Sequence, residues 1–157
     1  MIKFKNLKFI FLTLILTIGV SLITSQNIFA ATSKTAYTAK EINLLARLIT
    51  AEAQGEPYIV QVAVGAVVIN RVKSNRFPNS ITAVINQHVN GNYQFSPVRS
   101  GIINRPATAS ALKAAYAALN GTDPTKNALF FSNVTSNSKA ILARSGSIKL
   151  YNLIFTR

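Results

Sequence analysis

The sequence predicts a mostly helical α+β domain with a small antiparallel sheet near its C-terminal end. Three long segments carry helix start and stop signals, whereas the short β-rich segments lie in the last 30 residues. The chain has 157 residues, 49% of them hydrophobic, and no cysteine. We therefore expect one domain whose apolar core is stable without disulfides or thiolate metal sites.

The first 30 residues have the pattern of a secretory signal peptide. Three lysines among the first eight residues form a positive n-region, residues 9–22 form an apolar h-region, and a polar stretch precedes Ala30. We expect cleavage after Ala30, a linker over residues 31–37 and one domain over residues 38–157. An uncleaved N-terminal anchor is the alternative, although the apolar stretch is short for a bilayer span.

The first helix of the domain is predicted from about Ala39 to Gln54. Thr38 and Glu41 have the spacing of a capping box, in which each side chain binds a free backbone N–H of the other residue. Gly55 follows as the terminator.

A second helix is predicted over residues 57–73, beginning with Pro57 in the first turn. Its many valines and isoleucines suit a strand equally well by propensity. We favour a helix because 17 residues far exceed a typical strand of about five or six.

The rest of the chain alternates between short elements and one long helix. Ser80 is expected to cap a short helix through Asn86, and residues 87–105, rich in Asn and Gly, are expected to be irregular. An alanine-rich helix is predicted over residues 106–120, ending at Gly121. The segments Ala128–Ser132 and Ser147–Phe155 are the candidate strands, with about one helical turn over residues 139–144 between them.

The charge of the chain favours an anionic partner. Its 17 Lys and Arg face four acidic residues, and without residues 1–30 the net charge is still about +10. Because the chain carries an export signal, we expect the partner to be the cell wall with its anionic polymers or the membrane surface, and no nucleic acid. A basic surface that only aids solubility is the alternative.

A metal centre or a serine-type triad is not expected. His88 is the only histidine, and it lies in a stretch rich in Asn and Gly that is typical of a surface turn. We expect it to be a surface or hydrogen-bonding residue. No cofactor is expected either.

Glu52 is the strongest candidate among the four acidic residues for chemistry. It falls on the apolar stripe of the first helix, with Leu45, Leu48 and Ile49. A carboxyl group there loses hydration, which raises its pKa and keeps it protonated, as a general acid requires. The alternative is a buried structural carboxylate paired with a base such as Arg71.

Glu41 and Asp123 have structural explanations. Glu41 belongs to the capping box, and Asp123 follows a helix end in Gly-Thr-Asp-Pro, where Asp commonly stabilises a turn.

A resemblance to a known family covers roughly Leu44 to Phe131. Its most specific part is Ala-Glu-Ala-Gln-Gly-Glu-Pro over residues 51–57, joined downstream to Asn-Arg-Val over residues 70–72. The full set of matching stretches is 44–57, 61–72, 77–81, 94–98, 118–121, 123–125 and 128–131. In these motifs the chain resembles the cell-wall hydrolase family of spore cortex-lytic enzymes, the SleB/CwlJ type.

The resemblance implies a lysozyme-like or lytic-transglycosylase-like fold and cleavage of peptidoglycan at the cell wall or spore envelope. We expect the protein to be a monomer. The resemblance also implies that Glu52 is the catalytic acid and that Glu56, Gln94, Phe95 and Ser96 contribute to a substrate groove. Phe95 then either stacks on a sugar or pins a turn in the core. A lytic transglycosylase needs only Glu52, whereas hydrolysis needs a second carboxylate. A non-catalytic peptidoglycan-binding protein on the same fold is the alternative.

The chain departs from the family near its end. Many members close with Gly and His before a final Phe, whereas residues 148–155 contain no histidine, and the chain has no tryptophan.

Overall fold

The computed structural model describes residues 37–135, 142–143 and 146–157. The predicted signal peptide, the linker up to residue 36 and most of the turn predicted at residues 139–144 lie outside the described residues. Tyr37–Arg157 forms one compact unit. None of the helices in the described ranges is long and apolar enough to span a membrane.

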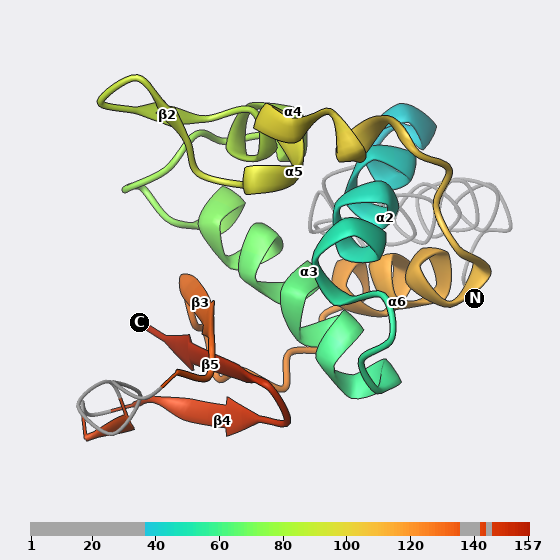
Figure 1. Ribbon diagram of the computed structural model, residues 1–157. Helices are drawn as coiled ribbons and strands as arrows, with labels where there is room; N and C mark the ends of the chain where they lie inside the picture. Colours follow the sequence, from blue (N-terminus) through green and yellow to red (C-terminus); the bar gives the residue numbers. More distant parts are fainter. Residues whose placement is uncertain (1–36, 136–141, 144–145) are drawn as a thin grey trace, which may run out of the picture. The chain divides into compact units, whose positions relative to one another are not determined.

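Three long helices form the centre of the unit (Figure 1). They are α2 (Ala39–Ala53), α3 (Tyr58–Lys73) and α6 (Ala109–Leu119), and each packs on the other two. The shorter elements are α4 (Ile81–Ile85), β1 (His88–Val89), β2 (Asn92–Tyr93), α5 (Ser96–Ser100), the 3-10 helix η1 (Ile102–Asn104), β3 (Phe130–Asn133), β4 (Ile148–Leu150) and β5 (Leu153–Thr156).

The predicted capping box of α2 is confirmed. The backbone N–H of Glu41 donates to Thr38 Oγ1 over 3.2 Å, and the backbone N–H of Thr38 donates to Glu41 Oε2 over 3.1 Å. The helix ends at Ala53, and Gly55 follows with a φ of 91°, a conformation that favours glycine. The chain therefore turns sharply just after Glu52.

The segment after this turn is a helix, as predicted, despite its β-branched residues. Eleven of the 16 residues of α3 are buried, so their side chains are packed on nearly every side of the helix. Tertiary packing thus outweighs the strand propensity. At Gly65 the neighbouring helices come close, because a Cβ built there would lie 3.0 Å from Ile49 Cδ1 and 3.1 Å from Ala118 Cβ.

Four other sequence predictions need correction at their boundaries. Residues 87–105 are not irregular throughout, since they contain the β1–β2 hairpin, α5 and η1. Helix α6 begins at Ala109 because the Thr108 side chain accepts from the N–H of Ala111 and caps it. Strand β3 begins at Phe130, two residues later than expected. The strand predicted over residues 147–155 is a hairpin, β4 and β5, that turns at Tyr151 with a φ of 51°.

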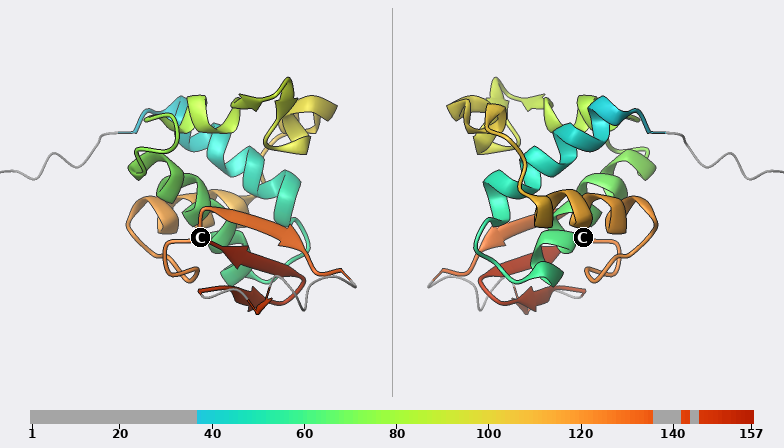
Figure 2. Two further views of the ribbon diagram at one scale, coloured as in Figure 1. Left: turned by 90° about the vertical axis from the view of Figure 1, so that its left-hand side faces the viewer. Right: turned by 90° about the vertical axis from the view of Figure 1, so that its right-hand side faces the viewer.

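The predicted small antiparallel sheet is confirmed, with the strand order β3-β5-β4. Phe155 in the central strand pairs with Phe131 on one side and Ile148 on the other. This sheet lies on one side of α3, and the β1–β2 hairpin with α5 lies on the other side (Figures 1 and 2). The two sides border the candidate site described below.

We expect Gly65→Val to destabilise the unit by about 1–3 kcal/mol, because the added side chain has no space between α2 and α6. Urea unfolding followed by circular dichroism measures the change. Ala109→Val is the control, since it adds similar bulk at an exposed helical position. Equal stability of the two variants would contradict the close approach.

Candidate active site

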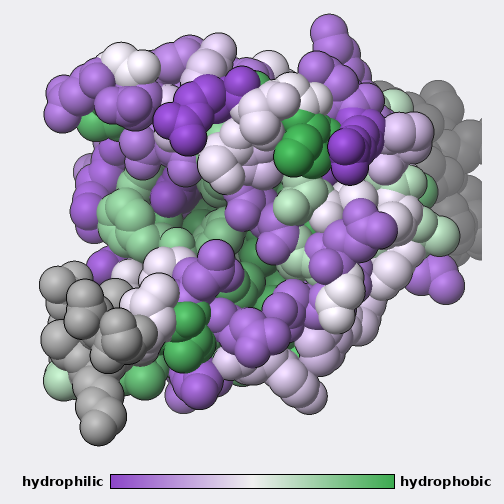
Figure 3. Space-filling view, viewed as in Figure 1, coloured by the Kyte–Doolittle hydropathy of each residue, from purple (hydrophilic) through white to green (hydrophobic). Residues whose placement is uncertain are grey.

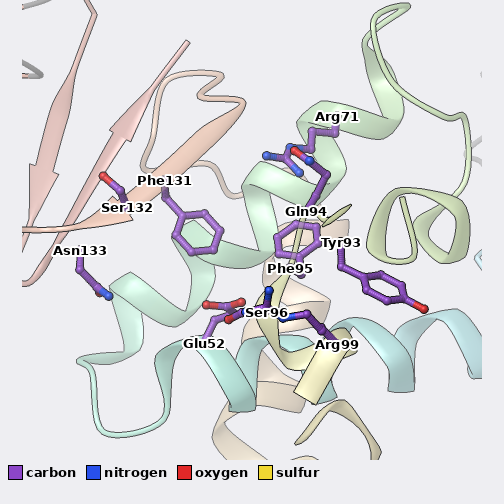
Figure 4. Close-up of a pocket in the computed structure, with 10 residues that line it drawn as sticks. All are labelled: Glu52, Arg71, Tyr93, Gln94, Phe95, Ser96, Arg99, Phe131, Ser132 and Asn133. Atoms are coloured by element: carbon purple, nitrogen blue, oxygen red, sulfur yellow. The ribbon is translucent and has the colours of Figure 1, made fainter. Parts of the chain in front are cut away.

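A cavity of about 400 Å³ lies between α2, the hairpin side and β3. The same face in the space-filling view is hollowed between a polar upper edge and the sheet below (Figure 3). The lining residues come from α2, α3, the β2–α5 stretch and β3 (Figure 4): Glu52, Arg71, Tyr93, Gln94, Phe95, Ser96, Arg99, Phe131, Ser132 and Asn133.

Glu52 reaches the cavity from the last turn of α2. Leu45, Leu48 and Ile49 on its stripe are fully buried, as the periodicity predicts. Burial raises the pKa of the Glu52 carboxyl. Within the described part of the chain, no hydrogen bond or ion pair to this carboxylate offsets the desolvation.

Arg71 lies in the same cavity but is held by other groups. Its Nε donates to the carbonyl of Leu129 over 2.7 Å. Its guanidinium carbon lies 5.0 Å from the ring centres of both Phe77 and Phe95 and 5.4 Å from that of Phe130. No ion pair to Glu52 is found, so the structural alternative of a paired Glu52 is not realised among the described residues.

Burial lowers the pKa of the Arg71 guanidinium, whereas it raises the pKa of the Glu52 carboxyl. Arg71 is only 4% exposed, and burial lowers its pKa to about 10. It therefore stays a cation at neutral pH, and it lies at a different end of the cavity from Glu52, whereas Arg99 lies nearer to Glu52 (Figure 4).

Asn70, next to Arg71, fixes the position of β3. Its side chain donates to Asp123 Oδ2 over 3.0 Å and to the carbonyl of Ala128 over 3.1 Å. Asp123 also accepts from the backbone N–H groups of Thr125 and Asn127, each over 2.8 Å. Burial alone would raise the pKa of Asp123, but these hydrogen bonds bring it below its ordinary value. The turn role expected for Asp123 is therefore confirmed.

Three of the four predicted binding residues line the cavity together with Glu52. Gln94 and Ser96 are exposed. Phe95 is only 3% exposed and lies near Phe131, with 6.3 Å between ring centres. Of the two possibilities for Phe95, the structure favours the buried wall over a free stacking surface.

Glu56 is not among the residues that line the cavity. Its Oε1 accepts from Asn152 Nδ2 over 2.8 Å, in the turn between β4 and β5. Its backbone carbonyl accepts from Gln61 Nε2 over 3.0 Å. The sharp turn at Gly55 directs Glu56 toward the sheet instead of continuing the face of α2.

Sequence reasoning missed several lining residues. Tyr93 is adjacent to the matched stretch 94–98, and its ring packs on His88 with 3.8 Å between centres. Ser132 and Asn133 carry no sequence signal, because only the pairing of β3 with β5 brings them to the cavity. Arg71 and Arg99 are not assignable from charge alone.

His88 is exposed, as expected, and no group of three His, Asp or Glu gathers within residues 37–135, 142–143 and 146–157.

We expect Glu52→Gln to become more stable relative to the wild type as the pH rises above about 4.3, the ordinary glutamate value. Because burial raises the pKa of Glu52 in the folded protein, protonated Glu52 contributes stability that is fully present below the ordinary glutamate pKa. This stability is lost as the pH rises through the pKa of Glu52 in the folded protein. Urea unfolding of both proteins between pH 4 and 8 measures the difference. A difference that does not change with pH would contradict the raised pKa.

Comparison with known proteins places the chain in a family. A family model described as Cell Wall Hydrolase matches residues 55–156. The matched range begins just after Glu52, so it includes β3 and the hairpin side of the cavity but not this carboxylate.

The curated relatives are longer proteins. The spore cortex-lytic enzyme of Bacillus cereus is 40% identical over 122 residues, which cover 77% of this chain and 46% of the relative. That of Bacillus subtilis is 38% identical over 108 residues, covering 69% and 34%. The chain thus spans less than half the length of these relatives.

This chain matches two solved structures over nearly the whole length of each. One is the catalytic domain of the Bacillus cereus SleB protein, 40% identical, covering 78% of this chain and 94% of that one with a TM-score of 0.67. The other is the catalytic domain of a germination-specific lytic transglycosylase, SleB, from Bacillus anthracis, 39% identical, covering 78% and 98% with a TM-score of 0.66. They confirm the predicted mostly helical, lysozyme-like fold. The chain therefore belongs to the cell wall hydrolase family.

Proposed function

We propose that this protein degrades peptidoglycan by cleaving the bond between N-acetylmuramic acid and N-acetylglucosamine, as a lytic transglycosylase. The observation that carries the proposal is that Glu52 is the only carboxylate lining the cavity. All four acidic residues of the chain lie in the described part, so the structure also gives the positions of the other three.

Those three carboxylates are engaged elsewhere. Glu41 caps α2, Asp123 holds the turn before β3, and Glu56 binds Asn152. Hydrolysis with inversion or retention uses two carboxyl groups on opposite sides of the scissile bond. A cavity with a single acid favours a route that needs no second carboxylate and no water.

In this route Glu52 acts first as an acid and then as a base. Its carboxyl proton goes to the glycosidic oxygen as the bond from this oxygen to C1 of the muramic acid breaks. The C6 hydroxyl of the same sugar then attacks C1 and gives its proton back to Glu52. The product is a 1,6-anhydro sugar, and Glu52 is protonated again for the next cycle.

The raised pKa of Glu52 supplies the protonated state that the first step requires. The apolar rings of Phe95 and Phe131 line the same cavity as this carboxyl group. Gln94 and Ser96 are exposed and carry donors and acceptors suited to sugar hydroxyl and N-acetyl groups. Glu56 has no direct part in this step, and its predicted share in substrate binding remains a prediction.

The similar proteins support the substrate class. The curated relatives are named spore cortex-lytic enzymes, and one solved relative is named a lytic transglycosylase. We further propose that the N-terminal signal exports the protein and that it acts at the cell wall or spore envelope. The basic charge of the chain fits binding to a wall rich in anionic polymers.

We expect the wild type to release muropeptides with 1,6-anhydro ends from purified peptidoglycan, and Glu52→Gln to release none. The amide cannot donate the proton, so the rate should fall by a factor of about 100 or more. Mass spectrometry of the released fragments measures both, since an anhydro end is one water lighter than a reducing end.

Glu56→Gln is the matched control, because it removes a carboxylate outside the cavity, and we expect it to keep the anhydro products. Reducing ends that depend on both Glu52 and Glu56 would show two-carboxylate hydrolysis instead. Binding of peptidoglycan by the wild type without any cleavage would show a non-catalytic binding protein.

A further inference from the structure

Strand β3 is an edge strand that borders the cavity of Glu52. The order of the sheet is β3-β5-β4, so β5 covers one side of β3, and none of the described strands covers the other (Figure 1). Three of its four residues, Phe131, Ser132 and Asn133, line the cavity. An edge strand carries backbone N–H and C=O groups without a ladder partner, which makes it a ready binding surface.

The register of β3 with β5 decides which main-chain groups point outward. In an antiparallel pair, residues alternate between those bonded to the partner strand and those whose N–H and C=O point away from it. The N–H of Val134 donates to the carbonyl of Asn152 over 2.8 Å, so Val134 is of the bonded kind. Asn133 and Phe131, one and three positions earlier in the same register, are of the other kind. Their N–H and C=O groups therefore point away from β5.

The contact of Arg71 with this edge indicates that its outer side faces the cavity. The carbonyl of Leu129, two positions before Phe131, accepts from Arg71 Nε over 2.7 Å, and Arg71 itself lines the cavity. The next outward groups belong to Phe131 and Asn133, and no described residue gives them a hydrogen-bond partner. Arg71 thus occupies the start of the edge, and the groups of Phe131 and Asn133 remain open.

The proposed substrate offers an amide for such a position. Both sugars of peptidoglycan carry an acetamido group on C2, which is bonded to C1, the atom at which the proposed reaction breaks the glycosidic bond. The acetamido group of the muramic acid therefore lies within one carbon of the atoms on which Glu52 acts. Asn133 extends from β3 toward Glu52 (Figure 4), and it is exposed. An amide carbonyl is a strong acceptor, the partner that a free backbone N–H requires.

The neighbouring groups suit an acetamido group better than an added strand. Only two outward residues are open between the Arg71 contact and the end of β3, whereas strands usually pair over at least three residues. The half-buried ring of Phe131, on the same face of the strand as Asn133, gives the acetamido methyl group an apolar contact.

We propose that the backbone N–H of Asn133 donates to the acetamido carbonyl of the N-acetylmuramic acid bound at Glu52. This inference rests on the proposed function, because it takes an N-acetylated glycan as the substrate. The ladder to β5 already fixes the donor, so binding orders no side chain and loses less entropy. The edge of β3 thus selects sugars that keep the acetyl group and positions C1 relative to the carboxyl group of Glu52.

The test measures binding, so that it does not depend on cleavage. Every protein carries Glu52→Gln, and Kd is measured by isothermal titration for soluble glycan strands without peptide stems, either N-acetylated or N-deacetylated. One protein also carries Asn133→Ala, and another carries lactic acid at position 133. These two share a methyl side chain and differ in one group, because the second has an ester oxygen in place of the N–H.

We expect the Asn133→Ala protein to prefer acetylated strands, and the lactic acid protein to show this preference reduced by about three- to tenfold, as for one hydrogen bond. Deacetylation also adds positive charge to the sugars, but this acts equally on both proteins and cancels in the comparison. Asn133→Pro also lacks the N–H, and an edge position with an outward N–H tolerates proline. It serves where the ester lowers the melting temperature.

Three results would overturn the proposal. They are no preference for acetylated strands in the Glu52→Gln parent, an equal preference in the Asn133→Ala and lactic acid proteins, and a preference that Asn133→Ala already abolishes, which would assign the contact to the side chain. In a further arm, the strands keep their peptide stems. An effect of the N–H seen only in that arm would identify a peptide as the ligand and also overturn the assignment. Failure of the wild type to release anhydro ends would overturn the proposed function alone.

Discussion

The desolvation of one carboxyl group is the constraint on which the site depends. Glu52 lies in the last turn of α2, where burial raises its pKa, and no described residue compensates its charge. A carboxylate in such a place favours its protonated form, because ionisation would leave a charge in poorly hydrated surroundings. The catalytic glutamate of lysozyme, which lies against an apolar wall, follows the same physics.

The β3 side of the cavity is held in place by polar contacts from α3. Asn70 and Arg71, adjacent at the end of α3, bind the carbonyl groups of Ala128 and Leu129. These contacts fix the start of β3, and the pairing of β3 with β5 then sets Phe131 beside Phe95. Arg71 is charged and almost fully buried, which is costly unless it is packed and paired. Three phenylalanine rings and one carbonyl offset part of this cost, whereas Nη1 is buried and has no hydrogen-bond partner among the described residues.

The parts of the fold that follow from local chemistry were predictable from the sequence. The capping box at Thr38, the cap at Ser80 and the turn at Asp123 depend on residues two to four positions apart. The contribution of Ser132 to the cavity depends on the pairing of β3 with β5, which lies far along the chain, so the sequence did not reveal it. The β1–β2 hairpin is local and turns at Asn90-Gly91, a turn signal that the interpretation of residues 87–105 as irregular passed over. The turn at Tyr151 is also local, but a tyrosine with positive φ carries no turn signal. Glu52 was found by its apolar stripe and by resemblance, but the direction of Glu56 was not, because Asn152 lies 96 residues away.

The most direct test of the central claim is the titration of Glu52 itself. The side-chain carboxyl carbon is followed by carbon-13 NMR between pH 3 and 9, and its signal is assigned by its absence in Glu52→Gln. The expected result is a midpoint above about 4.3, the ordinary glutamate value, because burial disfavours the charged form. A midpoint at or below that value would mean that the carboxyl group is hydrated or paired, and Glu52 could not then hold its proton for the sugar.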